Sequence, residues 1–380
     1  MRIAILGTRG IPNRYGGFEQ FAEYAAPLLA KRGHEVFVYN SSSHPFRGKE
    51  WNGVKLITKT DPENKLGTFG QFIYDFNCIM DARRANFDII LQLGYTSSSI
   101  WSFLLPREVV VITNMDGFEW ERKKYSRPVQ WFLRHAEKWA VKRSDVLIAD
   151  SFIMHSYLQN KYKITANYIP YGATPFNQPK ESSLNKYQLR KYEYNMVVAR
   201  IEPENNIETI IRGHLLSASP NVLFIVGHYK NKYGKYLQKK YEKAGIIFHG
   251  TLFDIHELNQ LRYFSSIYFH GHSVGGTNPS LLEAMASQAL IAAHDNGFNR
   301  DILGSDGFYF IDSSDIRNLL DTRIQKNDYS EKIKSNLAKI QRNFSWVHIT
   351  DLLEKCLYES KSSEKDTGLM TTKPLNEFIP

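Results

Sequence analysis

The sequence alternates short strand-like runs with amphipathic helix-like runs, and it does so in two successive blocks. In the first block the strand-like runs are rich in β-branched residues and are bounded by glycine or polar residues. Amphipathic stretches at 18–32, 69–84 and 128–143 stand between several of them. This alternation is typical of βαβ units and a largely parallel sheet. The strand-like runs are 2–7, 34–40, 88–94, 109–114, 145–150 and 166–172.

A break in the pattern separates the two blocks. Residues 174–191 contain two prolines and no apolar period, so we expect a linker there. The alternation restarts at 195–200 and ends in helical sequence from 314 to about 360. We therefore predict an α/β protein with two tandem Rossmann-like, doubly wound domains facing a cleft. The predicted boundaries are 1–175 for the N-terminal domain, 176–192 for the linker, 193–344 for the C-terminal domain, 345–360 for a C-terminal helix and 361–380 for a polar tail.

The charge of the chain is uneven. The net charge is +9, and residues 1–180 carry +8 of it, with 24 Lys and Arg against 16 Asp and Glu. The first half is therefore expected to meet an anionic partner, which can be nucleic acid, a membrane surface or a phosphorylated substrate. The basic residues come with no helix-turn-helix, zinc-finger or RNP pattern, so nucleic acid is not favoured.

Cysteine content and hydropathy point to a cytoplasmic protein. The two cysteines, Cys78 and Cys356, cannot build a disulfide framework or a cysteine-rich metal site. No apolar run approaches the ~18 residues of a membrane span, and the run after Met1 is too short for the core of a signal peptide.

The loop after the first strand-like run contains several glycines. It lacks the GxGxxG spacing of a dinucleotide fingerprint and the GxxxxGK[ST] spacing of a P-loop. Gly16 and Gly17 directly precede a predicted helix, where free backbone amides favour an anion such as phosphate. A plain flexible loop is the alternative interpretation.

The second block carries two further candidates at strand ends. Arg200 ends the run 195–200, where its guanidinium can hold a phosphate or pair with Glu202 or Glu204. After the run 267–270 comes a glycine-rich loop that leads into a helix. In that loop Asn278 is predicted to be the N-cap and Pro279 the first helical residue, so that Gly275, Gly276 and Thr277 present free amides.

Two other side-chain types belong to the same region. Glu283 lies one turn into the predicted helix among apolar residues, and it can accept hydrogen bonds from ribose hydroxyls. His270 and His272 have no third ligand nearby in the sequence. We therefore predict structural or substrate-contacting histidines and no metal site.

Taken together, these motifs resemble the GT-B glycosyltransferases of family 4 over about residues 1–360. The runs NMDGFEW (114–120), RIEPENN (200–206) and HSVGGTNPSLLEAMA (272–286) are similar to the capsule and exopolysaccharide rhamnosyltransferase branch of that family. The run FSW (344–346) with the helical sequence after it is similar to the family's C-terminal helix, which crosses back onto the first domain.

The resemblance implies a retaining, metal-independent transfer of a sugar from a nucleotide sugar, without a cofactor. The expected donor is dTDP-L-rhamnose, and the expected acceptor is a lipid-linked saccharide in surface polysaccharide assembly. Arg200 would neutralise the diphosphate leaving group, Glu283 would hold the ribose, and the absence of any Asp-x-Asp pair agrees with metal independence. The expected donor-binding residues are Gly16, Gly17, Arg200, His272, Gly276, Thr277, Asn278 and Glu283.

The sequence departs from the family pattern at three positions. Asn205 stands where the family has a lysine, and Arg9, Arg14 or another base is expected to substitute for it. Gly275 stands where the family has a glutamate that contacts the donor sugar, which hints at a different sugar such as a deoxy sugar. Asp116 occupies a region where many relatives carry a histidine. With Arg200 it is our candidate catalytic residue, as a sugar contact or an acceptor-side base, although it can equally cap the following turn.

A basic segment at 122–143 has eight Lys and Arg against one acid, with aromatic residues between them. We expect it to dock on an anionic membrane at the cytoplasmic face of the plasma membrane, the alternative being a solvated basic face. Its helical period places Val129, Phe132, Leu133, Ala136 and Ala140 toward the core. The residues predicted on the acceptor or membrane side are Arg122, Lys123, Lys124 and Arg127.

Two other functions remain open from the sequence. One is a GT-B-type nucleotide-sugar epimerase, for which we cannot assemble a set of acid and base residues. The other is a non-catalytic protein that binds a nucleotide sugar, because the family's lysine and first glutamate are missing.

Overall fold

The computed structural model describes residues 1–122, 124–241 and 245–366. Its first domain is built on an eight-stranded sheet, ordered β3-β4-β2-β1-β5-β6-β7-β8. All neighbouring strands are parallel except β3 and β4, which form a short antiparallel edge that the sequence did not reveal. The strands are β1 (Arg2–Leu6), β2 (Glu35–Ser41), β3 (Glu50–Trp51), β4 (Val54–Lys59), β5 (Ile89–Leu93), β6 (Val110–Asn114), β7 (Val146–Ala149) and β8 (Asn167–Tyr168).

Helices pack on the faces of this sheet, which explains why its central strands read as continuous apolar runs. The helix at 128–143 was predicted to bury Val129. Leu133, Ala136 and Ala140 are indeed buried, but Val129 lies exposed in the first turn. The helices are α1 (Gly17–Lys31), α2 (Glu63–Leu66), α3 (Thr68–Ala82), η1 (Ser99–Leu104), η2 (Glu119–Glu121), α4 (Arg127–Arg143) and α5 (Phe152–Tyr162).

The second domain has a six-stranded, fully parallel sheet ordered β11-β10-β9-β12-β13-β14. Its strands are β9 (Tyr194–Val198), β10 (Val222–Val226), β11 (Ile246–Gly250), β12 (Tyr268–His270), β13 (Ile291–His294) and β14 (Phe308–Phe310). Its helices are η4 (Pro203–Asn205), α6 (Ile207–Leu216), α7 (Lys232–Tyr241), α8 (Ile255–Phe264), α9 (Pro279–Ala286), α10 (Gly297–Leu303), α11 (Ser313–Asp321), η5 (Lys326–Tyr329) and α12 (Ser330–Asn343).

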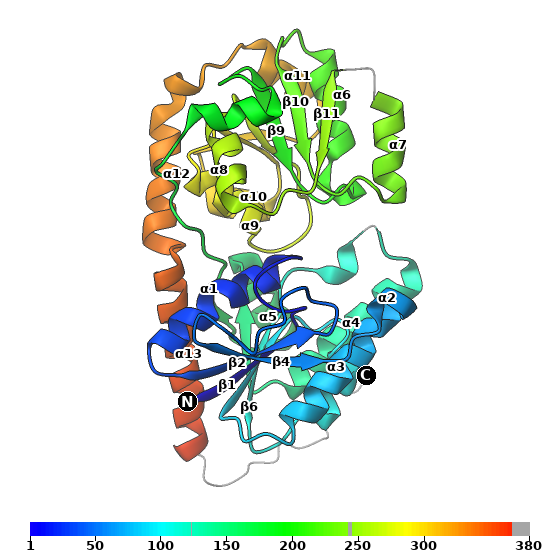
Figure 1. Ribbon diagram of the computed structural model, residues 1–380, viewed down its shortest axis with the longest axis vertical. Coiled ribbons are helices and arrows are strands. Elements are labelled where there is room, and N and C mark those ends of the chain that lie inside the picture. The colour runs from blue at the N-terminus through cyan, green and yellow to red at the C-terminus, as the bar shows by residue number, and fades with distance from the viewer. Residues whose placement is uncertain (123, 242–244, 367–380) are drawn as a thin grey trace.

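The strand order reverses once in each sheet. β1 pairs with both β2 and β5, and β9 pairs with both β10 and β12. Ligands of open α/β sheets bind outside the carboxyl ends of the strands at such points. Figure 1 shows the two domains one above the other, with the loop that precedes α9 reaching toward the first domain. The predicted pair of doubly wound domains is confirmed.

Two segments join the domains. The predicted linker is partly ordered by η3 (Glu181–Tyr187), where the hydroxyl of Tyr187 donates a 2.7 Å hydrogen bond to Glu257 of the second domain. The C-terminal helix α13 (Trp346–Asp366) returns along the first domain, as Figure 1 shows on the left. There Arg32 bonds to Glu354 at 2.9 Å, which confirms the crossing helix.

The helix α13 is longer than the sequence indicated. It includes residues 361–366, which we had assigned to the polar tail. Residues 367–380, the remainder of that tail, lie outside the described residues.

Candidate functional site

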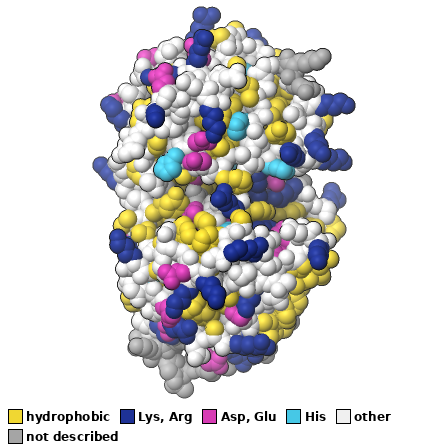
Figure 2. Space-filling model, viewed as in Figure 1, with side chains coloured by type: hydrophobic (Ala, Val, Ile, Leu, Met, Phe, Trp, Pro, Cys, Tyr) yellow, Lys and Arg dark blue, Asp and Glu magenta, His cyan; other side chains and the backbone are white. Residues whose placement is uncertain are grey.

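A cleft of about 540 Å³ lies between the domains. It is lined by the loops that follow β1, β5 and β6 of the first domain and β9 and β12 of the second. Figure 2 shows the hollow between the two halves, with dark-blue Lys and Arg side chains beside it. The sequence-predicted residues that line it are Gly16, Gly17, Asp116, Arg122, Lys124, Arg200, His272, Gly276, Thr277 and Asn278.

The loop between β12 and α9 carries the predicted helix start. Asn278 is the N-cap of α9, and its Oδ1 accepts a 2.9 Å hydrogen bond from the backbone N–H of Ser280. Pro279 is the first helical residue, as predicted. The hydroxyl of Thr277 donates to the backbone oxygen of Asp150 in the first domain, at 2.5 Å. The loop is therefore fixed both to its own helix and to the opposite domain.

Glycines allow this loop to approach the first domain closely. A Cβ on Gly276 would lie 1.9 Å from Oδ2 of Asp150, and one on Gly117 would lie 2.6 Å from the backbone nitrogen of Gly276. A side chain at position 276 would displace the Asp150 carboxyl group, and one at position 117 would require the backbone to shift. The glycine pattern thus reflects close contact between the domains.

Two carboxyl groups meet beneath the loop. Burial and the neighbouring charge of Glu119 raise the pKa of Asp116 to about 6. Burial and Asp116 raise the pKa of Asp150 well above its ordinary value. The backbone of Asp116 is left-handed, with φ of 46°, and its N–H donates to Oδ1 of Asn114 at 3.0 Å. Asp116 lines the cleft, and its carboxyl group also accepts a hydrogen bond from the backbone N–H of Gly117 in the same turn.

Arg200 and His272 lie in the second-domain half of the cleft. Arg200 is exposed. His272 stacks on His270, with ring centroids 4.4 Å apart and planes at 18°. Burial, Arg200 and Arg122 lower the pKa of His272 to about 3, so its imidazole is neutral at pH 7. A neutral imidazole can both donate and accept a hydrogen bond.

Glu283 is engaged in contacts that the sequence did not indicate. One carboxylate oxygen accepts a hydrogen bond from Arg262 at 2.6 Å, and the other accepts one from Gln20 at 2.5 Å. Glu283 is not one of the described residues that line the cleft. Its proposed role on ribose stays a prediction.

The residues predicted on the acceptor or membrane side lie in different surroundings. Arg122 lines the cleft, has a side chain only 13% exposed, and pairs with Glu119 at 2.6 Å. Lys124 also lines the cleft. Both side chains therefore face the cleft, and their acceptor-side role stays a prediction. Arg127 is exposed at the start of α4. Lys123 lies outside the described residues.

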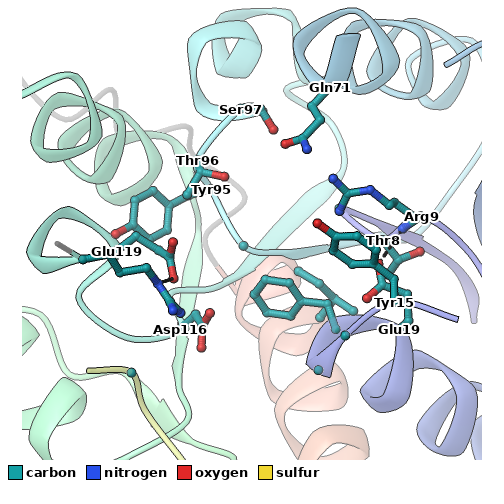
Figure 3. A pocket seen from close by; sticks show the side chains of 18 of the residues that line it. Thr8, Arg9, Tyr15, Glu19, Gln71, Tyr95, Thr96, Ser97, Asp116 and Glu119 are labelled. Carbon is teal, nitrogen blue, oxygen red and sulfur yellow. Dashed lines mark hydrogen bonds and ion pairs between the residues drawn. The ribbon is translucent and has the colours of Figure 1, made fainter. Parts of the chain in front are cut away.

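Polar side chains of the first domain, Arg9 among them, line one half of the cleft (Figure 3). The guanidinium of Arg9 makes two 2.8 Å bonds to Glu63 and lies 3.7 Å from the ring centroid of Tyr15. Arg9 is therefore already paired, and Arg14 is not among the described lining residues. Arg9 lines the cleft, and its substitution for the missing lysine stays a prediction.

Three residues at the site escaped the sequence analysis. Asp75 on α3 accepts a 2.6 Å bond from Ser97, and burial raises its pKa to about 7. Asp150 directly follows β7, and its place at the end of a strand could have indicated a site residue. Nothing in the sequence around Arg262 on α8 indicates its contact with Glu283, because only the packing of α8 against α9 brings the two together.

Across the described ranges, no group of three or more His, Cys, Asp or Glu side chains is placed to hold a metal ion. In the same part of the chain, every helix is too short or too polar to cross a membrane.

Comparisons with solved structures decide the fold. The chain superposes on sucrose-phosphate synthase from Thermosynechococcus elongatus with a TM-score of 0.79 at 16% identity, covering 95% of this chain and 99% of that one. It superposes on HepE from Anabaena, solved with UDP and glucose, with a TM-score of 0.74 at 17% identity, covering 94% of this chain and 99% of that one. On α,α-trehalose 6-phosphate synthase from Burkholderia multivorans the TM-score is 0.71 at 11% identity, covering 96% of this chain and 98% of that one. The chain has the GT-B fold.

The family model found by sequence comparison matches only part of the chain. A family model described as a domain of unknown function, DUF1972, matches residues 105–174, from just before β6 to just after β8. No curated protein matches the chain. The matched segment includes the inward-turning loop that carries Asp116, Arg122 and Lys124.

Proposed function

We propose that this GT-B protein is a glycosyltransferase that takes its sugar from a nucleotide sugar. The observation that carries the proposal is the meeting, in one cleft, of Arg200 and the Gly275–Asn278 loop with Asp116 of the opposite domain. One half offers a cation and free helix-terminal amides to a diphosphate, and the other offers carboxyl groups to hydroxyls. The Anabaena HepE structures, which hold UDP or UDP-glucose, are consistent with a donor of this class.

The proposed reaction needs no nucleophile from the protein. The bond between the anomeric carbon and the diphosphate oxygen breaks, and the acceptor oxygen bonds to the same face of that carbon. The acceptor proton passes to the departing diphosphate. Negative charge grows on the diphosphate, so fixed donors such as Arg200 and the amides before α9 stabilise the transition state. Asp116 would orient the acceptor hydroxyl, and no step uses a metal.

We propose L-rhamnose, delivered as dTDP-L-rhamnose, as the donor sugar. A side chain at position 275 would enter open space, since no atom lies within 4 Å of the Cβ position of Gly275. The family glutamate that would contact sugar hydroxyls there is missing, which suits a sugar with fewer hydroxyl groups.

A lipid-linked saccharide at an anionic membrane is the proposed acceptor. Exposed apolar side chains from α2, α3, η1 and α4 gather on the first domain, along the lower right edge of Figure 2. On α4 they alternate with exposed basic residues, a combination that suits an anionic lipid surface. The apolar members are Leu66, Phe69, Ile100, Phe103, Val129, Trp131 and Trp139, and the basic ones are Arg127, Arg134, Lys138 and Lys142.

A transfer assay tests the function. The protein is incubated with each common nucleotide sugar and a membrane lipid extract, and release of the nucleoside diphosphate and labelling of the lipid are followed. The proposal predicts labelling with dTDP-L-rhamnose and none with the Arg200→Ala variant. Labelling from another donor would keep the glycosyltransferase and reject rhamnose. Binding of nucleotide sugars without any turnover would reject the enzyme.

A further inference from the structure

The loop between β6 and α4 brings positive charge from the first domain to the donor half of the cleft. Lys124 lines the same cleft as Arg200 and His272. Its Nζ lies 3.4 Å from Oε1 of Glu202. The backbone N–H of Glu202 donates to the carbonyl of Arg200 at 2.9 Å. Lys124 therefore reaches across the cleft to the turn that presents Arg200.

The electrostatics of neighbouring groups agree with this geometry. Besides burial, Arg200 and Arg122 are the two groups that lower the pKa of His272. Burial and the charges of Glu119 and Glu202 raise the pKa of Tyr125 to about 12, while both arginines oppose that rise. Cations of both domains therefore act on the same small region.

Of the two first-domain cations, Lys124 is more able to change partners than Arg122. Arg122 is held by Glu119 at 2.6 Å. The Lys124–Glu202 contact, at 3.4 Å, is longer than the ~2.7–2.9 Å of a charge-assisted hydrogen bond. The Lys124 side chain is also 26% exposed. It can turn from Glu202 to an anion, and the Glu202 carboxylate, whose side chain is 19% exposed, then loses this cation.

The second domain alone supplies little charge for a diphosphate. Arg200 is the one Lys or Arg that its described residues contribute to the cleft lining. Asn205, on the same turn, donates its side-chain N–H to the carbonyl of Arg200 at 2.7 Å and carries no charge. A diphosphate carries more negative charge than one guanidinium balances.

We propose that Lys124 binds the diphosphate of the donor together with Arg200, so that the two domains share the diphosphate site. The inference rests on the proposed function and adds a donor contact from the first domain. On binding, the ammonium of Lys124 leaves Glu202 for a phosphate oxygen. Donor binding would then require the β6–α4 loop to face the second domain.

Calorimetric titration with UDP, dTDP, uridine and thymidine tests this inference. Lys124→Gln should weaken binding of the nucleoside diphosphate by about tenfold to a hundredfold, the range for a lost hydrogen bond to a charged group. Binding of the corresponding nucleoside should not change. Lys124→Arg should restore most of the affinity. The matched control is Lys239→Gln, an exposed lysine on α7 of the second domain that should behave as wild type.

A second variant tests the same site from the other side. Glu202→Gln removes the carboxylate that competes for Lys124, so it should strengthen diphosphate binding severalfold. Unchanged diphosphate binding in Lys124→Gln, or equal losses for nucleoside and diphosphate, would overturn the inference while leaving the proposed function intact. Weaker diphosphate binding in Glu202→Gln would overturn it too. If the wild-type protein bound no nucleoside diphosphate, both proposals would fail.

Discussion

Glu283 of α9 accepts a hydrogen bond of 2.5 Å from Nε2 of Gln20 on α1, so one carboxylate joins the two domains. Its second oxygen is held by Arg262 at 2.6 Å. The residue that the family resemblance assigns to the donor ribose is thus also an interdomain contact. Ribose hydroxyls that bind this carboxylate would compete with Gln20.

We expect Glu283→Gln to weaken donor binding, because an amide oxygen is a poorer hydrogen-bond acceptor for ribose than a carboxylate. Steady-state kinetics should show a higher donor KM, with a smaller change in kcat. Gln20→Ala serves as the control, since it removes only the interdomain bond and should leave the donor KM unchanged or lower. A rise confined to the acceptor KM would contradict our placement of the two substrates.

Arg262 is expected to contribute strongly to stability. Its side chain is 1% exposed, and Arg262→Met would leave the Glu283 carboxylate without its buried partner. Breaking a buried pair from one side typically costs about 3–5 kcal/mol. Urea denaturation should show a loss of that order. The control, Arg317→Met, breaks an exposed pair with Asp321 and should cost under ~0.5 kcal/mol. Equal losses in both variants would refute the role of burial.

Asp75 should make stability depend on pH. Burial raises its pKa from the ordinary 3.8 to about 7 in the folded protein. Between these values the folded chain binds a proton that the unfolded chain has released. The contribution of Asp75 to the free energy of unfolding is therefore fully present below pH 3.8. It is lost as the pH rises to 7, at about 1.4 kcal/mol per pH unit.

The variant Asp75→Asn lacks this titration and can still accept the hydrogen bond from Ser97. From pH 5 to pH 8 the unfolding free energy of wild type should fall relative to that of the variant by about 2–3 kcal/mol. Denaturation curves at the two pH values measure the difference. A constant difference would show that Asp75 is ionised throughout.

The apolar and basic face of the first domain should bind anionic vesicles. Trp131, 64% exposed on α4, is expected to insert its ring at the interface, so Trp131→Glu should reduce co-sedimentation severalfold. Phe253→Glu is the control, since Phe253 is 57% exposed on the second domain. Equal binding to neutral and anionic vesicles would remove the electrostatic part of the claim. Equal effects of both substitutions would remove the assigned face.

Much of the fold was predictable because its signals are local. The βαβ alternation and the N-cap at Asn278 follow from spacing and capping, the crossing helix follows from the family resemblance, and the structure confirms all three. The short edge strands β3 and β14 were missed because two or three residues carry no period.

The candidate site was predictable where a residue directly follows a strand, as Arg200 does. Arg122 and Lys124 line the cleft, which the run of basic residues did not indicate. They precede α4 on a loop, where no helical period shows the direction of a side chain. The partners of Glu283 come from α1 and α8, far away in the sequence, so no local pattern could reveal them.

A thermal-shift screen of wild type and Arg200→Ala against UDP, dTDP, GDP and their sugar conjugates tests the central claim most directly. Ligand binding to the folded protein raises Tm by linkage. We predict a rise with at least one nucleoside diphosphate, largest with dTDP and dTDP-L-rhamnose, that is lost in Arg200→Ala although this variant folds normally. A wild-type Tm that no nucleotide moves, or a shift that survives the loss of Arg200, would contradict the donor site proposed here.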